Sequence, residues 1–257
     1  MANHLLSFGV ATNWDFEKDA VALNARLSVE AYDPSVNRRR FAQMALRSSF
    51  SVPLRALSAD FNGARKSLRR VRSAIDYFRF FSRHAQHTPK RVWYNSDRGS
   101  ASIEDIIAEV QSQRRVPVFA KIDIEGSEYR ILPWIIESAD LFTGLTVEFH
   151  HTDICANIFN EQVGRLLESF RVAHVHGNNY GDLSVDGELP LSLEITFMHR
   201  SLASRSIGDP CASAAPLDAP NDPSRPDYEL DLRRAHIGGV RKWPFGLPRV
   251  GPSTERE

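Results

Sequence analysis

Cysteine is scarce in this chain, and that alone excludes several kinds of site. The 257 residues include only two cysteines, Cys155 and Cys211, and no Cys-x-x-Cys pair. A disulfide framework, a zinc site built from cysteines and a redox dithiol are therefore excluded.

Long apolar runs are also missing. No stretch reaches the roughly 18 apolar residues that a membrane-spanning helix needs. Residues 1–10 lack the basic region and the long apolar core that are typical of a secretory signal. We therefore expect a cytoplasmic protein without a membrane partner.

Acidic residues are rare in one part of the chain. The whole sequence balances 32 basic against 32 acidic side chains, yet residues 35–91 hold 14 basic residues and only two acids, Asp60 and Asp76. Such segregation indicates either a solvated helix face or a surface for an acidic partner. No recognised nucleic-acid motif accompanies it, so nucleic acid is not the expected partner.

Short apolar runs alternate with segments of helical spacing, which predicts an α/β fold. Strands are expected at 5–10, 29–34, 91–94, 116–124, 144–150, 172–177 and 193–198. Helices are expected at 15–27, 64–82, 102–113, from 127 with a break or kink at Pro133, and at 160–170. This order predicts a Rossmann-like, mainly parallel sheet with helices on both faces and a C-terminal antiparallel strand.

The domain boundaries follow from composition. Residues 1–200 are expected to form one domain, with a basic helical insertion at about 35–90. Residues 201–257 hold 8 of the 14 prolines and show little periodicity, so we expect a largely irregular tail.

In a sheet of this kind, the ligand lies beyond the carboxyl ends of the strands. Acids, imidazoles and amides gather at the expected strand ends: Gly9, Asn13, Asp33, Ser96, Asp97, Asp123, Glu125, Glu148, His150, His151, His176 and Asn178. This clustering predicts a polar ligand-binding rim.

Asp33 follows Gly9 by 24 residues, at the expected end of the second strand. An acid near this spacing accepts hydrogen bonds from ribose hydroxyls in nucleoside sites, although an aspartate before Pro34 could equally serve a turn. Ala11 and Asn13 stand where a phosphate-binding loop would have further glycines. The pattern therefore favours a ligand without phosphates over NAD.

The run Lys121-Ile-Asp-Ile-Glu-Gly-Ser-Glu128 resembles the Lys-Ile-Asp-Val-Glu-Gly-x-Glu signature of FkbM-type methyltransferases. Further similar segments are Ser7–Gly9, Ala31–Pro34 and Val147–His150, and the resemblance covers roughly residues 3–228. It implies a class I, Rossmann-like enzyme that uses S-adenosylmethionine (SAM). It also implies a cofactor site at the positions Gly9, Asn13, Asp33 and Asp97.

Methyl transfer to a hydroxyl requires a base that removes the proton of the acceptor. The candidates are Asp123, Glu125, His150 and His176. Asp123 and Glu125 would face the same side of an extended segment, although Glu125 and Ser127 could simply cap the following helix. The expected activity is SAM-dependent O-methylation of a small-molecule or saccharide hydroxyl, and an acidic acceptor would suit the basic insertion.

Two other functions stay open at this stage. The same acids and imidazoles could bind Mg²⁺ or Mn²⁺, either beside SAM or in a metal-dependent hydrolase. A degenerate, non-catalytic module could instead bind an acidic partner through the basic insertion, and neutralising Arg69, Arg70 and Arg72 would then abolish binding.

Overall fold

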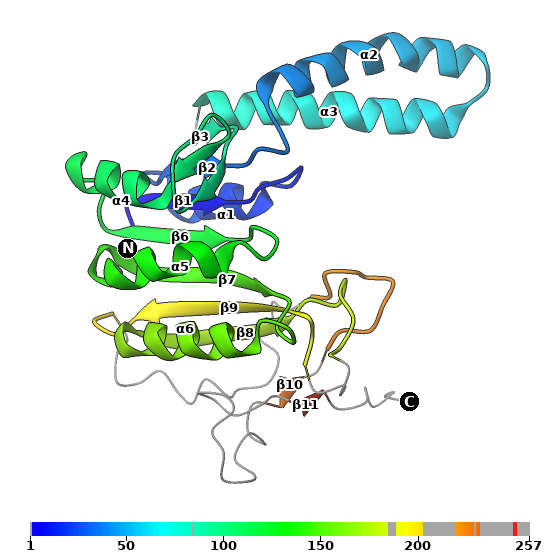
Figure 1. The fold of residues 1–257 in the computed structure, drawn as a ribbon. Coiled ribbons are helices and arrows are strands. Elements are labelled where there is room, and N and C mark those ends of the chain that lie inside the picture. Colours follow the sequence, from blue (N-terminus) through cyan, green and yellow to red (C-terminus); the bar gives the residue numbers. More distant parts are fainter. Residues whose placement is uncertain are drawn as a thin grey trace.

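The computed structural model describes residues 2–83, 85–184, 189–202, 219–228, 230–231 and 249–250. A seven-stranded sheet forms its centre, in the order β3-β2-β1-β6-β7-β9-β8 (Figure 1). The strands are β1 (His4–Phe8), β2 (Ser28–Tyr32), β3 (Ala85–Thr88), β6 (Val118–Ile122), β7 (Phe142–His150), β8 (Phe170–Gly177) and β9 (Ser192–His199). All are parallel except β9, which pairs antiparallel with both β7 and β8.

Helices cover both faces of this sheet, as the sequence predicts. The helices are α1 (Asp15–Leu23), α2 (Arg38–Leu57), α3 (Phe61–Arg83), α4 (Ile103–Ser112), α5 (Glu128–Glu137) and α6 (Ala156–Ser169), with a short 3-10 turn, η1 (Ala139–Leu141). Leu6, Phe8 and Ile122 share a core with α4, α5 and α6. Ser7 and Phe119 alternate onto the opposite face, where α1 contacts both. The fold is therefore Rossmann-like α/β.

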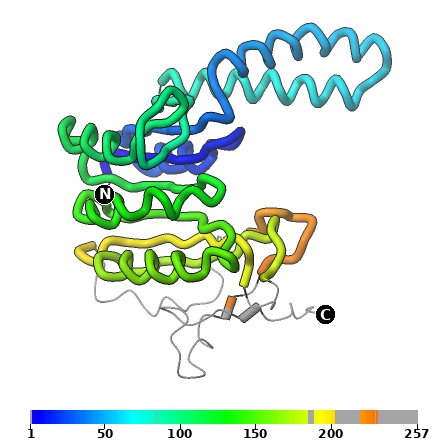
Figure 2. Tube along the Cα trace, in the orientation of Figure 1, coloured from blue at the N-terminus to red at the C-terminus, as the bar shows by residue number. Residues whose placement is uncertain are grey.

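The helices α2 and α3 form an antiparallel hairpin that projects from the sheet (Figures 1 and 2). It leaves the end of β2 and returns to β3. A second apolar cluster holds its base, where the rings of Phe41 and Tyr77 stack 4.2 Å apart and Trp14 packs against both. This hairpin is the basic insertion that the charge pattern predicts.

The predicted third strand of the sheet is wrong. Residues 91–93 do form a strand, β4 (Arg91–Trp93), but it pairs with β5 (Ser100–Ser102) in a separate two-stranded sheet. The third strand is instead β3, which the sequence analysis missed because Ala85-Gln-His-Thr88 has no apolar run. Helix α2 was missed as well, and α1 ends at Leu23 rather than at 27.

Of the two effects predicted for Pro133, a break or a kink, the break is wrong, because α5 runs through this residue to Glu137. A proline lacks the N–H that would bond to the carbonyl four residues earlier, here that of Tyr129. The buried Gln162 of α6 supplies the missing donor, since its Nε2 lies 2.7 Å from the Tyr129 oxygen. A side chain of the neighbouring helix thus satisfies the freed carbonyl.

Most of the predicted tail, with Cys211, lies outside the described residues. Within its described part, residues 219–228 contain no helix or strand, and β10 (Leu230–Asp231) pairs with β11 (Arg249–Val250). No helix in the described ranges is long and apolar enough to cross a membrane.

Candidate functional site

The chain reverses direction along the sheet between β1 and β6, so this is the switch point where the fold places a ligand. Gly9, the first residue after β1, has a φ of +85°. A Cβ atom here would lie 1.6 Å from the carbonyl oxygen of Asp123, which follows β6. Only glycine fits, and the loop after β1 therefore packs directly on the end of β6.

Asp33, at the end of β2, organises this loop. Its Oδ2 accepts hydrogen bonds from the backbone N–H groups of Val10 (3.0 Å) and Ala11 (2.7 Å), and its Oδ1 accepts one from Ser35 (2.6 Å). Burial opposes ionisation, but the hydrogen bonds from Ser35, Ala11 and Val10 lower the pKa of Asp33. The loop amides therefore bind an internal carboxylate instead of pointing freely into the crevice.

The other two residues of the expected cofactor set have local partners. Asn13 is exposed, and its Oδ1 accepts a hydrogen bond from the N–H of Asp15 at the start of α1. Asp97 lies in the loop between β4 and β5, where its Oδ1 accepts from the N–H of Gly99 at 2.7 Å. It does not follow a strand of the main sheet, contrary to the prediction.

The Lys121–Glu128 run fixes the end of β6 through polar contacts. Lys121 Nζ donates to the carbonyl of Gly9 at 2.5 Å and lies 3.4 Å from Asp123 Oδ2. Glu128 is fully buried, and its two carboxylate oxygens accept from the N–H groups of Gly126 (2.9 Å) and His150 (2.7 Å). The run thus ties together the ends of β1, β6 and β7.

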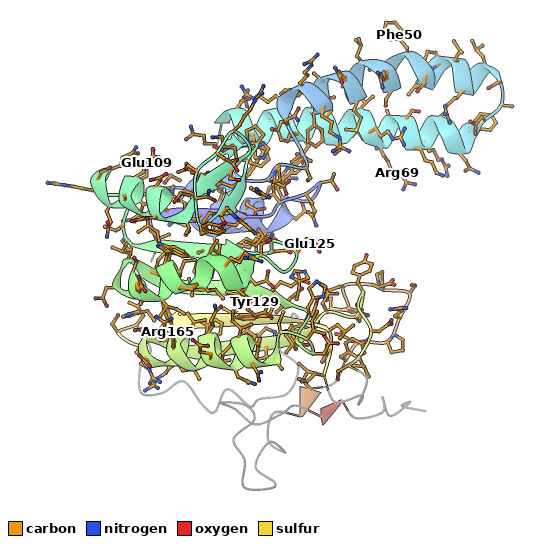
Figure 3. All side chains as sticks on the ribbon, in the orientation of Figure 1. Phe50, Arg69, Glu109, Glu125, Tyr129 and Arg165 are labelled. Carbon is orange, nitrogen blue, oxygen red and sulfur yellow. The ribbon has the colours of Figure 1, made fainter. Side chains whose placement is uncertain are left out.

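The alternative in which Ser127 caps α5 is wrong, because its side chain makes no capping hydrogen bond. Glu128, the first residue of α5, instead accepts a hydrogen bond from the N–H of Gly126 in the preceding turn. Glu125 occupies the turn with a φ of +54°, and its side chain is 87% exposed (labelled in Figure 3). Asp123 and Glu125 are therefore not neighbours on an extended segment.

Three residues converge at the carboxyl ends of β6 and β7: Asp123, Glu148 and His150. One ligand atom from each lies within 4.8 Å of the others, which is close enough to hold one divalent cation. Two of the three belong to the predicted catalytic set. Glu148 was placed on the rim by the sequence but was not chosen as a base.

Glu148 has the environment of a general base. Burial, reinforced by the neighbouring Asp123 carboxylate, raises the pKa of Glu148 to about 7. Asn178, the residue after β8, donates to its Oε1 at 2.8 Å and fixes its orientation. A base with a pKa near the working pH is the most effective one. The sequence signals for Glu148 are its position at an expected strand end and its place two residues before His150, on the same side of the strand.

The His150 ring is surrounded by carboxylates. Its nitrogens lie 3.4 Å from Glu128, 3.5 Å from Glu148 and 3.6 Å from Glu125. Burial alone would lower the pKa of His150, but these carboxylates raise it to about 9. The ring is therefore a cation at neutral pH and serves better as a donor or charge partner than as a base.

His176 lies outside the trio, although it is close in register. It pairs across β8 and β9 with Glu194, which in turn pairs across β9 and β7 with Glu148. The Glu194 and Asp227 carboxylates lie 3.5 and 3.1 Å from its ring nitrogens and, against burial, raise the pKa of His176 to about 9. These contacts connect β8 with β9 and with Asp227 of the C-terminal segment.

Part of the tail closes this side of the rim, which the sequence did not indicate. Asn179 is 1% exposed, and its side chain bonds to the backbone of Asp222, Arg225 and Pro226. With the His176–Asp227 contact, these bonds fasten residues 222–227 against the end of β8.

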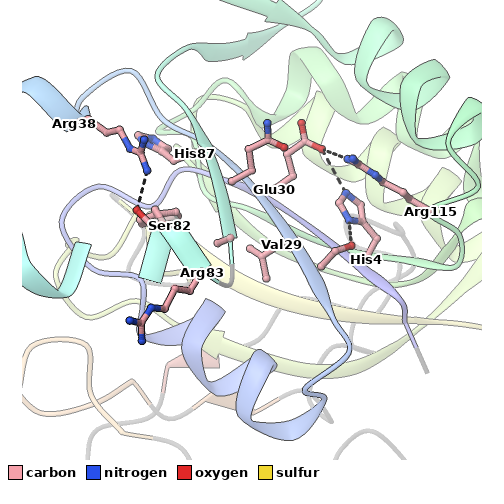
Figure 4. A pocket seen from close by; sticks show the side chains of 12 residues that line it. His4, Val29, Glu30, Arg38, Ser82, Arg83, His87 and Arg115 are labelled. Carbon is pink, nitrogen blue, oxygen red and sulfur yellow. Dashed lines mark hydrogen bonds and ion pairs between the residues drawn. The ribbon is translucent and has the colours of Figure 1, made fainter. Parts of the chain in front are cut away.

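A separate cavity of about 530 Å³ lies near the amino ends of β1, β2 and β3 (Figure 4). Glu30 lines it, held by Arg115 at 3.0 Å and His4 at 3.6 Å. Arg38, Arg83 and His87 line the other side. Because its strand residues lie at the opposite strand ends from the rim, this cavity is not a continuation of the site.

Comparison with known proteins adds no family to this picture. No family model matches the chain, and no curated protein matches it. The resemblance to FkbM-type methyltransferases therefore stays a prediction that depends on the Lys121–Glu128 run and its supporting segments.

Proposed function

We propose that this protein is a SAM-dependent methyltransferase that methylates a hydroxyl of a small molecule or a saccharide. The proposal depends on one observation: the Asp33 carboxylate accepts hydrogen bonds from the backbone N–H groups of Val10 and Ala11. In a dinucleotide-binding loop, such amides would hold a pyrophosphate. A carboxylate in that place repels phosphates and favours a cofactor that has none.

SAM fits this loop for two reasons. It contains no phosphate, and its sulfonium group is a cation. Asp33 and Asp123 provide negative charge at the ends of β2 and β6, which favours a cationic ligand. The loop from Gly9 to Ala11 would hold the cofactor, with Asp33 fixing the loop.

Bound SAM would supply an electrophilic methyl group beside the trio. Glu148 accepts the proton of the acceptor hydroxyl, because its pKa of about 7 keeps a useful fraction ionised at neutral pH. Asp123 and the charged His150 ring, within 4.8 Å, orient the hydroxyl toward it. Lys121 holds Gly9 and Asp123 in fixed relation.

The first test is calorimetric titration of the full chain with SAM, S-adenosylhomocysteine and NAD. We expect both adenosyl ligands to bind and NAD to fail. The absence of SAM binding at millimolar concentration, or binding of NAD in its place, would contradict the proposal. Transfer of labelled methyl groups to a panel of saccharides and small hydroxyl compounds then identifies the acceptor class.

Variants separate binding from chemistry. Glu148→Gln should retain SAM binding, since Glu148 belongs to the acceptor side, and should lose methyl transfer. Glu137→Gln is the matched control, because Glu137 lies on α5 with a side chain 69% exposed and pairs only loosely with Arg165, at 4.0 Å. It should behave like the unmodified chain.

A metal-dependent hydrolase is the second candidate, and the Asp123, Glu148 and His150 cluster favours it. This reading requires a divalent cation and no SAM. An activity that disappears with a chelator and persists without SAM would identify the hydrolase and exclude the methyltransferase.

A further inference from the structure

The outer side of α2 presents a stripe of large apolar side chains. Leu46, Phe50, Leu54 and Leu57 recur at intervals of three and four residues, so they lie along one side of the helix. Their exposed fractions are 61%, 71%, 72% and 87%. We call these four residues the α2 stripe.

The α2 stripe lies away from the core of the hairpin. The side of α2 that faces α3 contains the buried Phe41 and Ser48, and Ser51 bonds to Ser67 of α3 at 2.8 Å. In Figure 3, Phe50 and Arg69 point outward on opposite sides of the hairpin. The α2 stripe therefore takes no part in the packing of α2 against α3.

Positive charge accompanies the stripe. Helix α2 contains five arginines and no acid, and the hairpin from Arg38 to Arg83 contains twelve basic residues against two acids. Arg39 and Arg47 lie at helical positions beside the stripe, and neither forms an ion pair with a described residue. An apolar stripe flanked by free cations is typical of helices that lie at a membrane surface.

We propose that the α2 stripe docks on an anionic membrane surface. The leucines and Phe50 would enter the boundary between headgroups and acyl chains, while the arginines contact lipid phosphates. This proposal does not depend on the proposed enzymatic function. The expected lack of a membrane partner came from the absence of a long apolar run, which concerns only membrane-spanning segments.

Other occupants match the surface less well. A second copy would bring two hairpins together, each with twelve basic residues against two acids, and like charges repel. Nucleic acid would use the arginines but would leave the exposed leucines in contact with phosphates and water. An anionic bilayer satisfies both the apolar and the basic side chains.

Vesicle flotation of the full chain tests the proposal. We expect flotation with vesicles of phosphatidylcholine and phosphatidylglycerol, none with phosphatidylcholine alone, and weaker binding at high salt. The double variant Phe50→Ser/Leu54→Ser should weaken binding by about tenfold or more, because it removes two apolar anchors. Leu23→Ser on α1 removes an equally exposed leucine and should leave binding unchanged.

Three outcomes would overturn the proposal. The first is no flotation with anionic vesicles, or equal flotation of the native chain and the folded double variant. The second is a dimer in sedimentation analysis that the double variant converts to a monomer, because a second copy would then occupy the stripe. The third is heparin or DNA binding that the double variant retains, with no vesicle binding. Circular dichroism melting confirms that each variant is folded.

Discussion

Glu148 of β7 and Glu194 of β9 stand directly opposite each other in the antiparallel pair. Like charges in this position destabilise a sheet. Each carboxylate is held by an asparagine, since Asn178 donates to Glu148 and Asn221 to Glu194, both at 2.8 Å. The two carboxylates differ in pKa. Burial opposes the ionisation of both, but hydrogen bonds from His176 and Asn221 lower the pKa of Glu194, whereas burial and Asp123 raise that of Glu148 to about 7.

This arrangement predicts the pH dependence of methyl transfer. Glu148 must be ionised to accept a proton, so kcat/KM should rise as the pH passes through about 7 and level off above it. A pH–rate profile measures this limb. The folded Glu148→Gln variant should lose at least about a hundredfold in rate and show no such limb. An unchanged profile in that variant would assign the base elsewhere.

The same group predicts how stability changes with pH. Its pKa is raised from 4.5 to about 7 on folding, so the folded state binds this proton more tightly than the unfolded state. Its contribution is complete below about pH 4.5 and is lost as the pH rises through about 7. Urea unfolding should therefore show Glu148→Gln to be more stable than the native chain by about 2–3 kcal/mol at about pH 8, with a smaller difference at about pH 4. Glu137→Gln should show no such trend.

Glu128 should matter more for stability than its exposed neighbour in the same run. Glu128→Gln replaces one acceptor oxygen with an N–H₂ group, which leaves the amide of Gly126 or His150 without a buried partner. We expect a loss of about 2–3 kcal/mol in chemical denaturation. Glu125→Gln, at a side chain 87% exposed, should change stability by no more than about 0.5 kcal/mol. Similar losses in both variants would contradict this account of the run.

Gln162 and Pro133 should be coupled. Gln162→Ala leaves the Tyr129 carbonyl without its donor and should cost about 1–3 kcal/mol of stability. In a Pro133→Ala background the alanine N–H can bond to the same carbonyl, so the cost of Gln162→Ala should fall by about 1 kcal/mol. A double-mutant cycle from urea unfolding measures the difference. Strictly additive effects would show that Gln162 has no such role.

A chelator should leave methyl transfer unchanged. Glu148 accepts the proton directly, and the positive charge in the trio comes from the His150 ring, which its surrounding carboxylates keep protonated. Assays with and without EDTA, followed by added Mg²⁺ or Mn²⁺, check this. Loss of activity that is restored by one of these ions would assign the trio to metal binding.

Six of the seven strands of the main sheet could be predicted because each contains apolar residues in a short run or in alternation. The missed strand, β3, is a polar edge strand that depends on pairing with β2. Helix α2 was missed although its large apolar residues recur at helical spacing, and its interior contains Pro53, a residue that disfavours a helix. The start of the helix expected at 102–113 could be predicted because the cap of α4 is local in sequence: the Oγ of Ser102 accepts from the N–H of Asp105.

The sequence predicts the position of the candidate site, at the carboxyl ends of the strands, but not the role of each residue in it. Sequence order places polar residues at strand ends, and it correctly brought Asp123 and His150 together. It could not rank Glu148 above its neighbours, because the pKa of Glu148 depends on burial and on Asp123, a residue 25 positions away. Nor could it foresee that Asp33 binds the amides of Val10 and Ala11, since loop conformation decides that contact.

The position of β9 between β7 and β8 constrains how the nascent chain can fold. β8 joins the sheet only through β9, yet β9 is the last of the seven strands to leave the ribosome. Until Ser192–His199 emerges, β7 is an open edge whose unpaired N–H and C=O groups can capture another chain. The five strands β3, β2, β1, β6 and β7 would assemble first. Misassembly during synthesis is therefore most expected in the interval before β9 emerges.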